Sequence, residues 1–154
     1  MRPLLACLVL LISVAPALAA GDRPFSRCYR FPSVPRYVAI AEGAGEPSGR
    51  GSYAVRIYRA ADPQRPRSDF IVGSVRARSG AIEEVAFRDL DADGFDEVVI
   101  VMRQPGPAGL LAADAIGYRS GVLYLLEGVA DLPADADAVA ALKKALDDCD
   151  CHKD

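Results

Sequence analysis

The chain has 154 residues, of which 51% are apolar and 25% charged, with a formal net charge of −3. This length and composition suit one globular domain with a real core, and they exclude both a disordered tail and a two-domain enzyme. A mildly acidic chain also has no electrostatic reason to bind nucleic acid or anionic lipid.

The N-terminus predicts a signal peptide over residues 1–19. Arg2 supplies a positive start, residues 4–14 are almost continuously apolar, and Ala17-Leu18-Ala19 forms a small-x-small cleavage site. Cleavage there leaves residues 20–154 as a single domain and, with the loss of Arg2, moves the formal charge from −3 to −4. We therefore expect export, either to the periplasm of a Gram-negative cell or to the medium.

The same segment allows a second interpretation, as the lipidation box of a lipoprotein at Cys7. Cleavage at that box would leave an apolar run on the mature end, which favours the ordinary signal peptide. No later apolar stretch approaches the roughly 18 residues of a membrane span, and residues 98–102 are far too few. We therefore expect a soluble exported protein.

The mature chain predicts a mainly β fold, an antiparallel β-sandwich or barrel-like sheet of about eight strands. Short runs rich in β-branched and aromatic residues alternate with Gly, Pro, Ser and Asp clusters. Residues 52–59 alternate strictly, which fits a sheet packed on one face, whereas residues 98–101 do not alternate and predict a central strand covered on both faces. The expected strands are 28–31, 37–42, 52–59, 70–76, 82–87, 98–103, 113–118 and 122–127.

An acidic segment between two expected strands has the pattern of a calcium loop. Oxygen ligands at alternate positions, a glycine that permits a sharp turn and a carboxylate at the ninth position suit a hard cation. The candidate ligands are the carboxylates of Asp89, Asp91, Asp93 and Glu97 and the carbonyl of Phe95. The segment is not an EF-hand, because its twelfth position is apolar; it resembles the calcium loops of FG-GAP-type modules. The alternative is an acidic turn whose Asp side chains hydrogen-bond their own backbone.

The segment after the most apolar strand, residues 103–111, predicts a stiff projecting loop. It combines two prolines, two glycines and an apolar tip. A stiff loop loses little entropy on entering a partner's cleft, so it is a candidate binding element. The candidate contact residues are Arg103, Gly106, Pro107, Ala108, Gly109 and Leu110. The alternative is a long hairpin connection with no partner.

The C-terminal part predicts one helix of about three turns. Val139, Leu142 and Leu146 recur on one helical face, and Asp135 or Asp137 can cap the start. A helix of this kind would pack on the sheet.

Three cysteines remain after removal of the signal peptide. In an oxidising compartment we expect one disulfide from Cys28 to either Cys149 or Cys151. On the chain-entropy model, this disulfide would stabilise the fold by roughly 4 to 5 kcal/mol. The thiol left over could pair between chains and give a homodimer. Residues 149–152 also have metal-ligand types, but they lack a second ligand pair.

The sequence offers no catalytic set, so we predict that the protein is not an enzyme. Its only histidine, His152, lies near the C-terminus, where nothing would hold it in a cleft, which argues against a Ser-His-Asp or Cys-His site. Glu83, Glu84 and Asp114 could supply a glycosidase-like pair, but strand alternation normally puts such charges on the solvated face. We expect no required cofactor, and calcium is the one candidate ion.

Several blocks, in order along the chain, resemble the periplasmic inhibitor of I-type lysozyme, the PliI family of bacteria. They are residues 51–58 (GSYAVRIY), 69–73 (DFIVG) with 75–76 (VR), 82–83 (IE), 89–94 (DLDADG) leading into 97–101 (EVVIV), 111–115 (LAADA) and 131–133 (DLP). The resemblance extends over roughly residues 38–142, most of the mature domain.

The resemblance implies a β-sandwich or barrel-like antiparallel fold, a periplasmic location and a lysozyme as partner. It further implies inhibition of an I-type lysozyme by a loop inserted into the active-site cleft, which protects peptidoglycan. The aligned loop is residues 103–111, where members typically carry a Ser-Gly-x-Tyr-like tip and this chain has Pro107-Ala108-Gly109-Leu110. The alternative function is an exported calcium-binding β module that binds an envelope protein or glycan.

Overall fold

The structure is a computed structural model, and it describes residues 23–150. The predicted signal peptide, Cys151 and His152 lie outside the described residues. In chain order the elements are β1 Ser26–Arg30, β2 Arg36–Glu42, β3 Gly51–Arg59, β4 Phe70–Arg78, β5 Ala81–Arg88, β6 Glu97–Arg103, β7 Leu111–Arg119, β8 Val122–Leu132 and α1 Ala138–Asp150. The prediction of a mainly β fold of about eight strands with one C-terminal helix is confirmed.

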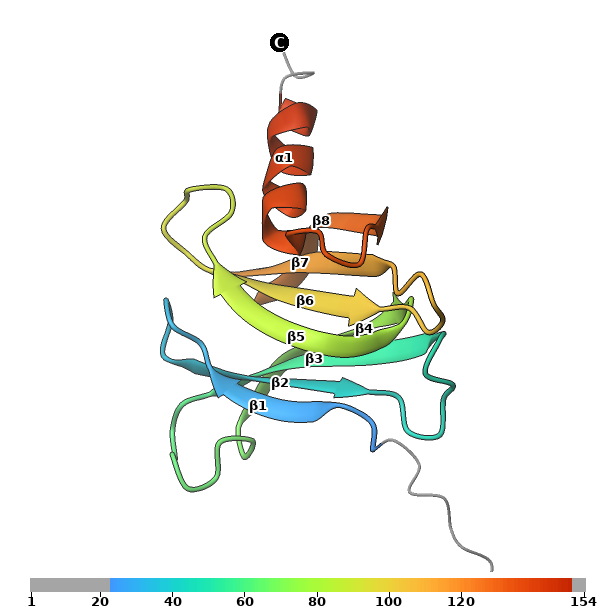
Figure 1. The fold of residues 1–154 in the computed structure, drawn as a ribbon. Helices are drawn as coiled ribbons and strands as arrows, with labels where there is room; N and C mark the ends of the chain where they lie inside the picture. The colour runs from blue at the N-terminus through green and yellow to red at the C-terminus, as the bar shows by residue number, and fades with distance from the viewer. Residues whose placement is uncertain (1–22, 151–154) are drawn as a thin grey trace, which may run out of the picture.

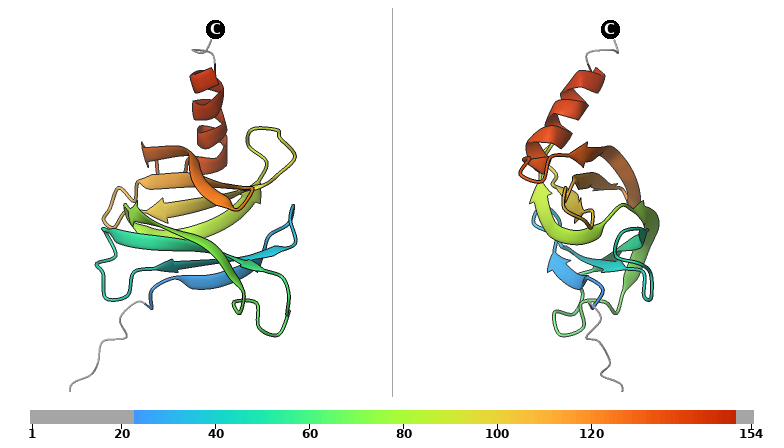
Figure 2. Two further views of the ribbon diagram at one scale, coloured as in Figure 1. Left: turned by 180° about the vertical axis from the view of Figure 1, so that it is seen from behind. Right: turned by 45° about the vertical axis from the view of Figure 1, so that its right-hand side comes forward.

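The strands form two four-stranded antiparallel sheets that lie face to face (Figure 1). Sheet A has the order β1-β2-β3-β4, and sheet B has the order β5-β6-β7-β8. Helix α1 lies on the outer side of sheet B, and within residues 23–150 no element covers the outer face of sheet A (Figure 2). The fold is therefore a sandwich, one of the two architectures that the sequence left open.

The core lies between the sheets because each strand places alternate apolar side chains on one face. On β3, Tyr53, Val55 and Ile57 point toward sheet B and are fully buried. On β6, Val98 and Ile100 belong to this core, while Val99 and Val101, which alternate with them, pack on the α1 side. The prediction that this strand is covered on both faces is confirmed.

Helix α1 closes the outer face of sheet B through its apolar stripe. Leu142 is fully buried there, and Val139 and Leu146 pack beside it. Asp137 caps the helix, because its Oδ1 accepts hydrogen bonds from the backbone N–H groups of Val139 and Ala140, each 3.0 Å away. Within the described part of the chain, no helix is long and apolar enough to span a membrane.

A polar bridge joins the two sheets inside the sandwich. The hydroxyl of Tyr53 on β3 donates to Oδ2 of Asp114 on β7, which also accepts from Nε of Arg76 on β4 at 3.3 Å. Burial, and then the Asp114 carboxylate, raise the pKa of Tyr53 far above its ordinary value. Asp114, considered above as a catalytic carboxylate, is therefore held in a structural contact.

We expect Tyr53→Phe to lower the free energy of unfolding by about 1 to 2 kcal/mol, because it leaves Asp114 without one buried donor. Urea denaturation at pH 7 measures the change. Tyr58→Phe, on the outer face of sheet A, is the matched control and should change stability by less than about 0.5 kcal/mol. Equal losses in the two variants would contradict the role of the bridge.

The cysteines require a correction to the sequence-based expectation. Cys28 on β1 and Cys149 in the last turn of α1 are both exposed and free, so the expected pairing of these two is not formed. They lie on opposite sides of the molecule, because sheet B separates sheet A from the helix (Figure 1). The alternative pairing, with Cys151, falls outside the described residues. Nearness in sequence to the two chain ends was a poor guide to this pairing, since β1 and the last turn of α1 lie far apart (Figure 1).

Candidate functional site

The segment that connects β6 to β7, residues 104–110, is here called the β6–β7 loop. It extends past the strand ends at the right of Figure 1, on the side where the β2–β3 loop, residues 43–50, also lies. Its tip, residues 105–108, is exposed, while Gly109 and Leu110 at its base are half-buried. The loop therefore presents four residues to a partner.

The backbone of the β6–β7 loop is held in a narrow turn. The N–H of Gln104 donates to the carbonyl of Leu110 at 2.9 Å, and the N–H of Gly109 donates to the carbonyl of Gly106 at 3.2 Å. Gly106 has a φ of 111° and Gly109 a φ of 52°, so the turn requires glycine at the first and favours it at the second. Two prolines fix φ at other positions of the tip. The loop is consequently preorganised.

Arg103, the last residue of β6, braces the base of this loop. Its Nε and Nη2 contact the Glu83 carboxylate on β5 at 2.6 and 3.2 Å. Its Nη1 donates to the carbonyl oxygens of Gly109 at 2.9 Å and Ala134 at 3.2 Å. Although the sequence suggested Arg103 as a contact residue, these bonds give it a positioning role. Glu83, considered above as a catalytic carboxylate, is the ion-pair partner of Arg103.

Arg78, at the end of β4, fixes the neighbouring β2–β3 loop. It is only 3% exposed. Its guanidinium donates to the carbonyl oxygens of Gly80 at 2.5 Å, Ser48 at 2.8 Å and Pro47 at 3.0 Å. It also lies 3.6 Å from the Glu42 carboxylate. Sequence reasoning missed this residue, because its acceptors are backbone carbonyls, which side-chain patterns do not reveal.

The two loops are in contact. A Cβ built on Gly49 would lie 3.0 Å from Cγ of Pro105, so these two residues touch. Beside the contact is an open groove of about 390 Å³, lined in part by Ile82 and Gln104. The hydrogen bonds of Arg78, here called the Arg78 clamp, hold the β2–β3 loop in place. That loop in turn supports the β6–β7 loop.

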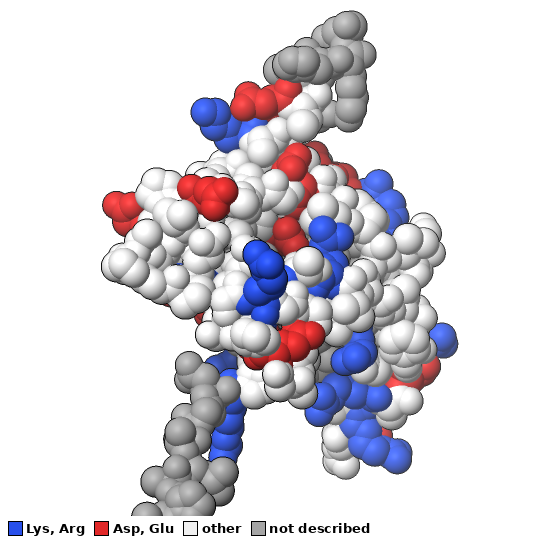
Figure 3. Space-filling model, turned by 90° about the vertical axis from the view of Figure 1, so that its right-hand side faces the viewer, with Lys and Arg blue, Asp and Glu red and all other residues white. Residues whose placement is uncertain are grey.

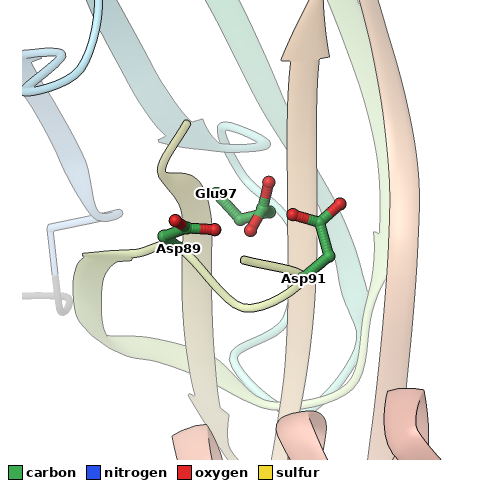
Figure 4. A group of neighbouring side chains, drawn as sticks. All are labelled: Asp89, Asp91 and Glu97. Carbon is green, nitrogen blue, oxygen red and sulfur yellow. The ribbon is translucent and has the colours of Figure 1, made fainter. Parts of the chain in front are cut away.

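The acidic β5–β6 loop lies at the other end of the sandwich. The carboxylate oxygens of Asp89, Asp91 and Glu97 lie within 4.8 Å of one another and point toward a common space (Figure 4). Glu97, at the start of β6, is only 2% exposed, and its Oε2 accepts from the N–H of Leu90 at 2.9 Å. Burial, and then the charges of Asp91, Asp89 and a third Asp, raise the pKa of Glu97 to about 6.

Asp93, the fourth predicted carboxylate ligand of this loop, has another partner. The carboxylate of Asp93 forms an ion pair with Arg119, and the Phe95 ring lies 5.5 Å from the same guanidinium. Asp89 also accepts from the N–H groups of Asp93 and Gly94, at 3.1 and 3.0 Å. The structure thus gathers three of the four predicted carboxylate ligands, and it contains the backbone hydrogen bonds of the alternative, an acidic turn.

Comparison with known proteins identifies the family. The family model described as periplasmic lysozyme inhibitor of I-type lysozyme, PliI, matches residues 25–146. No curated protein matches the chain significantly.

Two solved structures are similar to this chain. Aeromonas hydrophila PliI in complex with Meretrix lusoria lysozyme is 38% identical, with a TM-score of 0.71, over 77% of this chain and 95% of that one. PliI-Ah, the periplasmic lysozyme inhibitor of I-type lysozyme from Aeromonas hydrophyla, is 36% identical, with a TM-score of 0.71, over 77% of this chain and 98% of that one. The family match covers most of the chain, and these identities extend over nearly all of both relatives. The chain therefore belongs to the PliI family of periplasmic inhibitors of I-type lysozyme.

Proposed function

We propose that this protein inhibits an I-type lysozyme by inserting the tip of its β6–β7 loop into the active-site cleft. The observation that carries the proposal is the preorganised projection: an exposed tip at residues 105–108 above a base braced by Arg103. A loop already held in one conformation loses little entropy on binding. The relative that is 38% identical is itself in complex with a lysozyme.

The tip is suited to occlude a cleft by shape and by backbone hydrogen bonds. It offers the rings of Pro105 and Pro107, the Ala108 methyl group and the exposed backbone of Gly106. Glycosidases use a pair of carboxyl groups, and backbone N–H groups can donate to such acceptors. The carbonyl and N–H of Gly109 are already engaged within the loop, so Gly106 and Ala108 are the better candidates for these contacts.

An inhibition assay tests the proposal. The mature chain, residues 20–154, is titrated into I-type, c-type and g-type lysozymes, and the lysis rate of cell walls is recorded. We expect the turnover of the I-type enzyme to fall with a one-to-one endpoint. Equal lysis with and without excess protein, for all three enzymes, would remove the proposal.

Calcium binding at the β5–β6 loop is a second candidate function, supported by the three converging carboxylates of Asp89, Asp91 and Glu97. Negative charges gathered around a buried carboxylate repel one another, and a divalent cation would offset that repulsion. The cation would stiffen the connection between β5 and β6. It could do so in an inhibitor, or in an exported module that binds an envelope protein or glycan.

We expect Glu97→Gln, in the presence of chelator, to raise the free energy of unfolding at pH 8 by about 2 kcal/mol. The pKa of Glu97 is raised from 4.5 to about 6, so the folded protein binds this proton more tightly than the unfolded chain. The contribution of Glu97 to wild-type stability should therefore be fully present below pH 4.5 and be lost as the pH rises through 6, whereas the variant should lack this loss. Urea denaturation from pH 4.5 to 8 measures both.

Calcium itself provides the second arm of this test. The melting temperature of the wild type should rise with calcium, and Asp91→Ala should abolish the rise. Glu84→Gln, on the exposed side of β5, is the control and should respond like the wild type. No calcium response would leave the segment as an ordinary turn.

A further inference from the structure

The outer face of sheet A is an open platform on the side of the molecule opposite α1. The inner face packs on sheet B, and α1 covers sheet B, but no described element covers the outer side of sheet A (Figures 1 and 2). Two of its side chains are unusually exposed for large apolar residues, Phe70 at 58% and Val75 at 69%. Together with the half-buried aromatic side chains beside them, they give this face apolar surface that a partner could cover.

The strand register arranges this face into rows. One row crosses all four strands from Arg30 through Tyr37 and Tyr58 to Phe70. The rings of Tyr58 and Phe70 pack edge to face, 5.8 Å apart. The next row contains Arg56, whose side chain covers a glycine in that row. The face therefore carries an aromatic row with arginines at its end and beside it.

A third arginine comes from the β3–β4 loop. Arg67 lies in the segment that joins β3 to β4, two neighbouring strands of sheet A. Arg30, Arg56 and Arg67 are exposed, and none forms an ion pair with a described carboxylate. Their charges are available to an external ligand.

The two sheets carry opposite formal charges, which largely cancel in the net charge of the chain. Residues 23–80, which form sheet A and its loops, contain eleven arginines and four carboxylates, a formal charge of +7. Residues 81–150 contain five basic and fifteen acidic side chains, a formal charge of −10. Figure 3 shows basic side chains gathered in the lower part of the view, toward sheet A, and most acidic ones above. The sheet A platform should therefore attract anions.

We propose that the outer face of sheet A binds a glycan strand that bears carboxylates, the chemistry of peptidoglycan. Sugar rings can stack on the aromatic row, and the arginines can pair with carboxylates by two parallel hydrogen bonds. Tyr37 and Tyr58 are half-buried in the sheet, and arginines flank the aromatic row, which suits an anionic polymer better than insertion into the apolar interior of a lipid bilayer. This binding would concentrate the inhibitor on the polymer that its target enzyme degrades.

The glycan platform and the β6–β7 loop lie on different sides of the molecule. The platform is the outer face of sheet A, and the loop extends from the end of sheet B (Figure 1). One molecule can therefore bind a glycan and a lysozyme at once. The two activities can also be measured apart, because inhibition can be followed with a soluble oligosaccharide substrate.

A sedimentation assay with purified peptidoglycan sacculi tests this proposal. The mature wild-type chain should sediment with sacculi, and binding should weaken about tenfold or more when salt rises from 50 to 500 mM. Arg56→Glu and, independently, Phe70→Ser should each weaken binding about tenfold and leave inhibition with the soluble substrate unchanged. Lys144→Glu on α1 is the charge-matched control and should bind like the wild type.

Two further probes distinguish peptidoglycan binding from general glycan binding and from lipid binding. Chitin, a neutral glycan, should bind at least about tenfold more weakly than sacculi, and vesicles rich in anionic phospholipid should not compete with sacculi. The proposal is overturned if sacculi do not retain the wild type, if Arg56→Glu and Lys144→Glu bind equally, or if vesicles bind in place of sacculi. Circular dichroism of each variant confirms that it is folded.

Discussion

Ala108→Glu is expected to weaken inhibition of an I-type lysozyme by about a hundredfold or more. The residue is exposed at the tip of the β6–β7 loop, so the substitution leaves the fold intact. In the complex, the new carboxylate would be desolvated beside the catalytic carboxyl groups of a glycosidase. Like charges brought together in an interface cost several kcal/mol, and a hundredfold corresponds to about 2.7 kcal/mol. The inhibition constant with a soluble oligosaccharide substrate measures the effect.

Ala61→Glu is the matched control for this variant. Ala61 is exposed in the β3–β4 loop, which lies at the other end of the sandwich because successive strands alternate in direction. The control should inhibit like the wild type, and both variants should melt within a few degrees of it. If Ala108→Glu were folded and inhibited as strongly as the control, the tip could not lie in the cleft.

Arg78→Met should cause the largest loss of stability, about 3 to 5 kcal/mol in the free energy of unfolding. The variant removes the donors of at least three backbone carbonyls and leaves the Glu42 carboxylate, only 9% exposed, without its cation. Each buried acceptor left unpaired adds a desolvation cost. Urea denaturation measures the change.

Two further variants define what Arg78 does. Arg78→Lys should recover little of the lost stability, because one ammonium group cannot donate to all the backbone carbonyls that the planar guanidinium reaches. Arg50→Met, at an exposed position of the same loop region, should change stability by less than about 0.5 kcal/mol. A loss below about 1 kcal/mol for Arg78→Met would show that the clamp is not needed.

The alternation of apolar residues made the secondary structure readable from the sequence, but it could not assign strands to sheets. Residues 79–80 connect β4 to β5 as a hairpin turn would, yet β4 and β5 belong to different sheets. Gly80, with a φ of 108°, lies where the chain crosses over. β8 continues to Leu132, beyond its predicted end, because its far end still pairs with Leu111. Such features depend on partners distant in the sequence.

The features of the candidate site that depend on neighbouring residues could be predicted from the sequence. Those that depend on contacts between residues far apart in the sequence could not. Prolines and glycines predicted the stiff loop, but the bracing of Arg103 by Glu83 joins residues 20 positions apart. The spacing of the aspartates predicted a cation site, but the partner of Asp93 is Arg119 on β7, which no spacing rule connects to the loop. Family membership confirms the predictions of a periplasmic location and of an inhibitor rather than an enzyme.

Competition for the lysozyme cleft tests the central claim most directly. An oligosaccharide that fills the cleft without being hydrolysed is held at saturation, and the affinity of the mature chain for an I-type lysozyme is measured by calorimetry. If the β6–β7 loop occupies the cleft, the apparent Kd should rise in proportion to the ratio of oligosaccharide concentration to its own Kd. An unchanged Kd, with a ternary complex of inhibitor, lysozyme and oligosaccharide, would contradict the account.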